Sequence, residues 1–256
     1  MKISHVIFDF DGTLSWLRHG WPEMMLGLFR EHYPSLGEPE ETLRQKMLEI
    51  VLGMNGRPTI VQMQRFRELA LNRGRQLPEA ENLRAEYQCR LDQCVAERTS
   101  CILSGKSLPD DFVVFGGRAF LAALKKIGLV LIILSTTLKE RVWDEARILQ
   151  IDPYFGRHIY GGTGDPGQFS KKAVIQRLLA EESLPGKNLL SFGDGPVEIA
   201  DTKEAGGLAI GVASDENHNG SGLMDPWKKQ QLLAAGADEV IADFRDLPRL
   251  LTWLGS

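Results

Sequence analysis

The sequence contains few cysteines, and they do not form the pattern of a metal site or a disulfide framework. The three are Cys89, Cys94 and Cys101, and their spacing is not that of a zinc site. An odd count in 256 residues fits a reducing compartment, so we interpret them as packing residues. The five histidines are also scattered without metal-ligand spacing.

An excess of positive charge is absent as well, since the formal net charge is −4. Proteins that bind nucleic acid or anionic membranes usually carry a basic excess, so we expect neither partner. The longest apolar run, which ends at Leu134, is far shorter than the roughly 20 residues of a membrane span. The first residues lack the cleavage site of a signal peptide, so we expect a cytoplasmic protein.

Two patterns of hydrophobic residues divide the chain. Between Trp16 and Arg98 apolar residues recur at helical spacing in four stretches separated by glycine and proline, which predicts an all-helical segment. From Asp111 onward, continuous apolar strands alternate with amphipathic helices, which indicates a parallel sheet covered on both faces. The strand at Ile3–Phe8 belongs to that sheet. We therefore predict an α/β fold, with a core at 1–15 and 108–256 and an inserted helical domain at 16–107.

Polar residues follow the predicted strands where each strand ends. Asp9 and Asp11 follow the first strand, Ser135 follows the run ending at Leu134, and Asp194 follows a later one; Lys171 stands in another loop between a strand and a helix. In an open parallel sheet, ligands bind beyond the carboxyl ends of the strands. Carboxylates suit a hard divalent cation, while a lysine and a hydroxyl suit phosphate oxygens. This inventory indicates phosphoryl transfer.

These segments resemble the four motifs of the haloacid dehalogenase superfamily of phosphohydrolases. The resemblance rests on "DFDGT", the apolar strand ending in Ser135, the lysine near Ser170 and "FGDGPVE", which occur in the family's order. It implies a Rossmann-like core and a cap domain inserted between the first and second motifs, where the helical segment lies.

The resemblance also implies roles for the matching residues. Asp9 resembles the nucleophile that forms an aspartyl-phosphate, and Asp11 the general acid and base. A metal, expected to be Mg²⁺, would be bound by Asp194, a side-chain oxygen of Asp9 and the backbone carbonyl of Asp11. The residues expected to bind the phosphoryl group are Thr13, Ser135 and Lys171.

Three positions leave alternatives open. Glu198 stands where the family often has an aspartate, so it could ligate the metal through water. Lys172 adjoins Lys171, but the spacing to the apolar residues of the following helix favours Lys171. Ser135 could instead cap the helix that follows it.

The segment after the first motif is expected to lie over the crevice, so Arg18, His19 and Trp21 are candidates for substrate contact or gating.

From the residues at the strand ends and the resemblance, we predict a Mg²⁺-dependent phosphatase acting on a small phosphorylated metabolite, a sugar phosphate being one candidate. A phosphomutase with the same chemistry is the alternative. A non-catalytic dinucleotide-binding module is a further alternative, because residues 162–167 match G-x-G-x-x-G, although Pro166 interrupts the match.

Overall fold

The computed structural model describes residues 3–34, 36–54, 57–163 and 169–254. The chain forms two compact units, one of Met1–His19 with Thr99–Ser256 and one of Gly20–Arg98. The divisions thus fall after His19 and Arg98, whereas the sequence placed them after residues 15 and 107. The difference has a packing reason: Leu17 and Ile102 are both buried in the core of the sheet unit.

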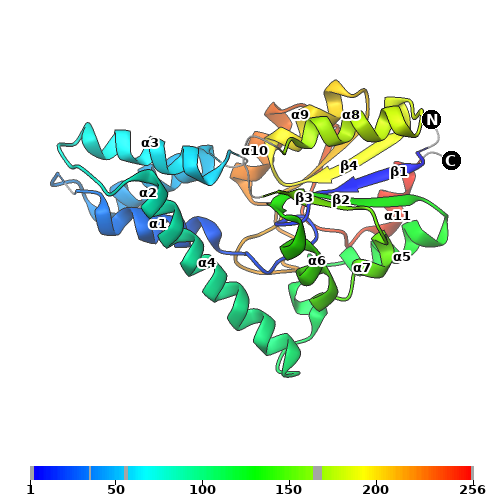
Figure 1. Cartoon of the computed structure of the whole chain (residues 1–256), viewed down its shortest axis with the longest axis horizontal. Helices are drawn as coiled ribbons and strands as arrows, with labels where there is room; N and C mark the ends of the chain where they lie inside the picture. Colours follow the sequence, from blue (N-terminus) through cyan, green and yellow to red (C-terminus); the bar gives the residue numbers. More distant parts are fainter. Residues whose placement is uncertain (1–2, 35, 55–56, 164–168, 255–256) are drawn as a thin grey trace. The chain divides into compact units, whose positions relative to one another are not determined.

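The first unit is built on a parallel sheet of six strands in the order β3-β2-β1-β4-β5-β6 (Figure 1). From β1 the chain adds β2 and β3 on one side of the sheet, and then adds β4, β5 and β6 on the other side of β1. The carboxyl ends of β1 and β4 therefore flank the topological switch point of a Rossmann-like fold. The strands are β1 (His5–Phe8), β2 (Val130–Leu138), β3 (Ile159–Gly162), β4 (Leu189–Gly193), β5 (Leu208–Val212) and β6 (Glu239–Ile241).

Helices cover both faces of the sheet because alternate strand residues are apolar on both sides. Phe8 packs with Phe120 on one face, whereas its neighbour Ile7 packs with Val174 and Leu178 on the other. Figure 1 shows α8 and α9 on one face and α5, α6 and α7 on the opposite one. The helices of this unit are α5 (Gly117–Lys126), α6 (Lys139–Ile148), α7 (Asp152–Phe155), α8 (Lys171–Glu181), α9 (Pro196–Glu204), α10 (Pro226–Ala234) and α11 (Leu247–Thr252), with 3₁₀ turns at Pro109–Phe112 and Gly186–Asn188.

The second unit is helical and has its own apolar core. Stacking of Phe29 on Phe66, with ring centroids 3.7 Å apart, joins its first and third helices. Met25, Met63 and Leu83 are buried in the same core. The helices are α1 (Trp21–His32), α2 (Glu40–Gly53), α3 (Thr59–Leu71) and α4 (Ala80–Leu103), the last turn of which belongs to the first unit.

The predicted α/β fold class is confirmed, and two local expectations change. Strand β2 continues through a register irregularity to Leu138, and Leu138 is the N-cap of α6, so the alternative that Ser135 caps that helix is wrong. Cys89 is exposed and the other two cysteines are half-buried, so Cys89 is not a packing residue. The glycine-rich segment that begins at Gly162 continues into residues 164–168, which lie outside the described residues.

No helix among the described residues is long and apolar enough to cross a membrane.

Candidate active site

Asp9 and Asp11 lie on either side of the buried Phe10, directly after β1. The backbone N–H of Asp9 donates to the Phe192 carbonyl of β4 at 2.9 Å, so the chain is still paired with the sheet at Asp9. The Phe10 carbonyl then accepts the N–H of Ser15 at 2.8 Å, which closes a turn. The buried ring and this turn fix the positions at which the two aspartates leave the sheet.

Gly12 allows that turn to approach the end of β4. Its φ of +75° lies in the left-handed region, and a Cβ built on it would stand 2.2 Å from Oδ2 of Asp194. A side chain at this position would be both strained and in collision with Asp194. Glycine therefore brings the first motif and Asp194 together.

Three carboxylates converge at the switch point. Asp194 follows β4, and Glu198 lies in the first turn of α9, where its Oε1 accepts the backbone N–H of Gly195 at 2.7 Å. One carboxylate oxygen from each of Asp9, Asp194 and Glu198 lies within 4.8 Å of the other two. Clustered carboxylate oxygens are the ligands that hard divalent cations prefer.

The ammonium group of Lys171, from the first turn of α8, lies among these acids. Its Nζ is 2.9 Å from Asp9 Oδ1 and 3.4 Å from Glu198 Oε2. Burial would lower the pKa of Lys171, but the charges of Asp9 and Glu198 outweigh it, and the pKa is raised. Lys172 is half-buried as a residue, with a side chain that is 43% exposed, and pairs with Glu204 at 2.6 Å instead.

Burial raises the pKa values of two of the carboxyl groups. Burial raises the pKa of Asp194 to about 7 although the charge of Lys228 opposes it. Burial likewise raises the pKa of Glu198 to about 8, against the opposing charge of Lys171 and with the charges of Asp9 and Asp194 adding to it. Crowded carboxylates repel one another, and a divalent cation bound between them would offset that repulsion. The donor set therefore fits a divalent metal.

The carboxylate of Asp11 is bound separately, by partners on both of its oxygens. Oδ1 accepts a hydrogen bond from Nη1 of Arg18 at 2.5 Å, and Oδ2 accepts one from Oγ1 of Thr137 at 2.8 Å. Arg18 also forms a bidentate pair with Glu145. The two aspartates of the first motif thus have different surroundings: Asp9 pairs with a lysine, and Asp11 with an arginine and a hydroxyl.

The two hydroxyl residues expected at the phosphate are both buried. Ser135 Oγ, 1% exposed as a residue, accepts the backbone N–H of Thr137 at 3.0 Å. Thr13 is 0% exposed, and its hydroxyl makes no hydrogen bond among the described residues. Thr13 lies in the turn that carries the aspartates, but its side chain is closed off from solvent.

A family comparison agrees with this arrangement. The sequence model of the haloacid dehalogenase-like hydrolases matches residues 3–206, a range that includes both aspartates of the turn, Lys171 and Asp194. The chain belongs to this family. It is therefore an enzyme of the hydrolase class, and the resemblance seen in the sequence is confirmed. No curated protein matches the chain.

Solved structures similar to this haloacid dehalogenase-like hydrolase cover nearly all of it. A haloacid dehalogenase-like protein of unknown function from Agrobacterium tumefaciens is 18% identical over 99% of this chain and 100% of its own, with a TM-score of 0.68. A predicted phosphoglycolate phosphatase from Haemophilus somnus and a candidate β-phosphoglucomutase from Thermotoga maritima are each 18% identical over 98% of this chain and 99% of their own, with TM-scores of 0.63 and 0.61. At these identities the likeness shows the fold alone.

One buried lysine near these acids, Lys228, was not predicted from the sequence. Nζ of Lys228, in α10, lies 3.2 Å from Asp194 Oδ2 and 2.5 Å from Glu216 Oε1. Burial would lower the pKa of Lys228, but the charges of Glu216 and Asp194 outweigh it, and the pKa is raised. The segment "DPWKK" predicts the start of a helix, and Asp225 does cap α10. Nothing in this segment indicates that Lys228 is buried.

Glu145 was also missed, although the sequence held a signal for it. It lies three residues after Val142 and four before Leu149, both fully buried, and so shares the apolar face of α6. A charged residue on such a face requires a partner, because an unpaired buried charge is costly. Its partner, Arg18, was a candidate for substrate contact or gating, and the structure places it against two carboxylates.

The other two candidates for substrate contact are placed differently. The His19 ring stacks on Trp16 with centroids 3.5 Å apart, and its Nδ1 lies 2.6 Å from the Trp16 carbonyl oxygen. Trp21 begins α1 in the helical unit and packs partly against the core of that unit.

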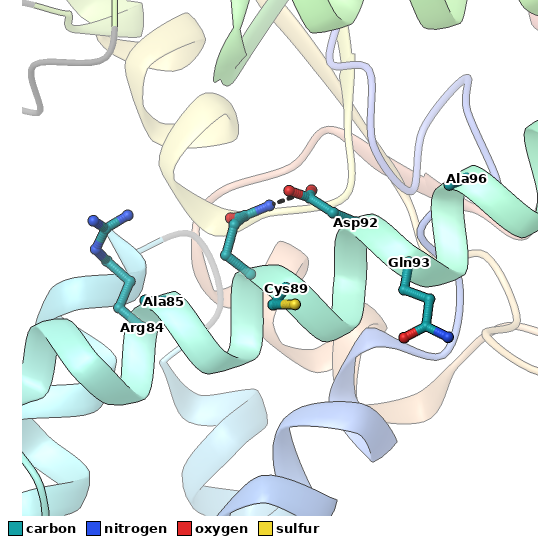
Figure 2. A pocket seen from close by; sticks show the side chains of 7 residues that line it. Arg84, Ala85, Cys89, Asp92, Gln93 and Ala96 are labelled. Atoms are coloured by element: carbon teal, nitrogen blue, oxygen red, sulfur yellow. Dashed lines mark hydrogen bonds between the residues drawn. The ribbon is translucent and has the colours of Figure 1, made fainter.

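An open depression also lies along α4 in the helical unit (Figure 2). Arg84, Cys89 and Asp92 are among its lining residues, all of which come from this one helix. Gln88 donates to Asp92 Oδ1 at 2.7 Å within it. Its lining offers exposed and half-buried side chains of a single helix surface and no cluster of catalytic groups.

Proposed function

We propose that this hydrolase is a Mg²⁺-dependent phosphatase that hydrolyses a small phosphorylated metabolite through an aspartyl-phosphate on Asp9. The observation that carries the proposal is the separation of the two aspartates: Asp9 is grouped with Asp194, Glu198 and Lys171, whereas Asp11 is bound by Arg18 and Thr137. A nucleophile and a proton carrier need different surroundings.

In the first step a carboxylate oxygen of Asp9 attacks phosphorus as the bond from phosphorus to the leaving oxygen breaks. Asp11 gives its proton to the leaving oxygen, so that the leaving group departs as a neutral alcohol. In the second step Asp11 takes a proton from water, and the water oxygen attacks phosphorus. The bond to Asp9 breaks, and inorganic phosphate is released.

Lys171 would bind a phosphoryl oxygen beside Asp9, with the hydroxyl of Ser135 as a further candidate donor. Asp9, Asp194 and the backbone carbonyl of Asp11 would bind Mg²⁺, with Glu198 as a direct or water-mediated ligand. When bound, Mg²⁺ would neutralise the repulsion between an anionic nucleophile and an anionic phosphate.

The direct test is hydrolysis of p-nitrophenyl phosphate by the purified protein with and without Mg²⁺. We expect Mg²⁺-dependent release of nitrophenol that Asp9→Asn reduces to background, whereas Asp144→Asn, an exposed control, retains full activity. The mechanism would be refuted if Asp9→Asn had wild-type activity, or if neither Mg²⁺ nor a chelator changed the activity of the wild type. Thermal denaturation gives an independent readout: Mg²⁺ should raise the melting temperature of the wild type but not that of Asp194→Asn.

The substrate requires a panel of phosphorylated metabolites, with inorganic phosphate and the organic product both measured. Release of phosphate in equal amount to the lost ester supports a phosphatase. Conversion of one sugar phosphate to its isomer without phosphate release would indicate a phosphomutase.

A further inference from the structure

The guanidinium group of Arg18 lies between two carboxylates. Nη1 is 2.5 Å from Asp11 Oδ1 and 2.5 Å from Glu145 Oε2, while Nη2 is 2.5 Å from Glu145 Oε1. The pair with Glu145 is bidentate, which fixes the plane of the guanidinium as well as its position. Arg18 therefore directs a further N–H of Nη1 to Asp11 from a fixed position.

Burial distinguishes the three side chains. Those of Arg18 and Glu145 are 10% and 8% exposed, whereas that of Asp11 is 26% exposed. Asp11 is thus the member of the group that solvent, and hence a ligand, can reach. A buried charge held by two carboxylates is poorly suited to contact a substrate but well suited to hold another side chain.

The second oxygen of Asp11 completes the restraint. Thr137 Oγ1, from β2, donates to Oδ2 at 2.8 Å, so both oxygens of the carboxylate have partners from different elements. Rotation of the carboxylate would break at least one of these contacts. Arg18, Glu145 and Thr137, which we call the Asp11 clamp, together fix the orientation of this carboxylate.

We propose that Arg18, held by Glu145, is a positioning residue that aims the Asp11 carboxylate for proton transfer to the leaving oxygen. The proposal rests on the proposed function, in which Asp11 is the general acid. This role differs from substrate contact and gating, the two for which the sequence made Arg18 a candidate. Because a misplacement of about 1 Å can cost about 10²-fold in rate, a residue that touches only the acid can still control the chemical step.

The role has a specific chemical signature. A leaving oxygen that departs as a strongly basic alkoxide needs the proton from Asp11 as the bond to phosphorus breaks. A leaving group that is a stable anion needs little help. A misoriented Asp11 carboxylate should therefore slow the hydrolysis of esters with basic leaving groups. It should have little effect on the hydrolysis of esters with weakly basic leaving groups.

The experiment compares kcat/KM for phenyl, p-nitrophenyl and 2,4-dinitrophenyl phosphate, which differ in the basicity of similar leaving groups. For Arg18→Lys we expect a loss of about 10- to 100-fold with phenyl phosphate and less than about 3-fold with the dinitrophenyl ester, with KM nearly unchanged. Glu145→Gln and Thr137→Val should show the same selectivity to a smaller extent. Arg245→Lys, which alters another bidentate pair in the same unit, should match wild type on all three esters.

An equal loss on the three esters, or a rise in KM alone, would overturn the proposal in favour of a structural or substrate-binding role. Circular dichroism checks the fold, and if Arg18→Lys does not fold, Glu145→Gln and Thr137→Val decide by the same criterion. Asp11→Asn distinguishes a failure of the positioning role of Arg18 from a failure of the general-acid role of Asp11. If Asp11→Asn is selective for basic leaving groups and the clamp variants are not, only the role of Arg18 fails. If Asp11→Asn is itself unselective, the general acid is misassigned, and both proposals fall.

Discussion

The ammonium group of Lys171 lies 2.9 Å from the Asp9 carboxylate, although the two residues belong to different βα units, Asp9 following β1 and Lys171 beginning α8. The contact joins the start of α8 to the turn after β1 at the switch point of the sheet. It sets Lys171 apart from Lys172, its neighbour in sequence, whose ammonium group is exposed and pairs with Glu204.

The pair of lysines provides a matched test of the proposed phosphate site. Lys171→Met should reduce phosphatase activity by about 10²-fold or more, because it removes a preorganised charge from the position where negative charge develops. Lys172→Met should change activity by less than about 2-fold, since it removes only an exposed pair. Steady-state kinetics with p-nitrophenyl phosphate measures both, and equal activities would contradict the assignment.

Lys228 is expected to contribute strongly to stability. Lys228→Met removes the cation that pairs with the buried carboxylate of Asp194, so the free energy of unfolding should fall by about 3 kcal/mol or more. Lys203→Met, which removes the pair with Asp238 at a more exposed position, should cost about 1 kcal/mol or less. Urea denaturation of the metal-free proteins measures the difference. A loss at Lys228 no greater than that at Lys203 would show that the buried ion pairs add no net stability.

Gly12 allows backbone strain to be separated from collision. Gly12→Ala and Gly128→Ala both place a side chain at φ near +80°, which costs about 1 kcal/mol, but only at Gly12 does the new Cβ meet another group, Asp194 Oδ2. Gly12→Ala should therefore be clearly less stable than Gly128→Ala. It should also lose the stabilisation by Mg²⁺ that Gly128→Ala retains. Thermal denaturation with and without Mg²⁺ tests both points, and identical behaviour of the two variants would refute the close approach.

The raised pKa of Glu145 leads us to predict that the stability of the protein depends on pH. Burial raises its pKa from 4.5 to about 7, although the Arg18 charge opposes the shift. Because the folded state binds this proton more tightly than the unfolded state, the stabilisation is complete below about pH 4.5 and is lost as the pH rises through about 7. Relative to Glu145→Gln, the wild type should lose up to about 3 kcal/mol of unfolding free energy over this interval.

Unfolding in urea at a series of pH values measures this effect. Asp144→Asn, which changes the exposed neighbour, should follow the wild-type curve. If the wild-type and Glu145→Gln curves run parallel from pH 4.5 to 7, the carboxyl of Glu145 does not take up a proton in this range.

The positions of Asp9, Asp11 and Asp194 could be anticipated because each follows an apolar strand directly. Strand ends can be read from local sequence, and in a parallel sheet they lie along one edge. The choice of Lys171 over Lys172 was also accessible, since helical spacing puts Lys171 on the side of the apolar face. The Asp11 clamp was not accessible in the same way: Arg18 and Glu145 are 127 residues apart, and no local pattern relates them.

The sequence by itself thus determined the α/β class, the order of the strands along the chain and the acids at their ends, because hydrophobic periodicity and strand termini are local properties. Only the tertiary structure decided which buried charges meet. It pairs Lys228 with Asp194, and Arg18 with Asp11 and Glu145. Such pairings depend on how α10 and α6 pack against the sheet, and the cost of burying an unpaired charge selects the partners only once that packing has brought them together.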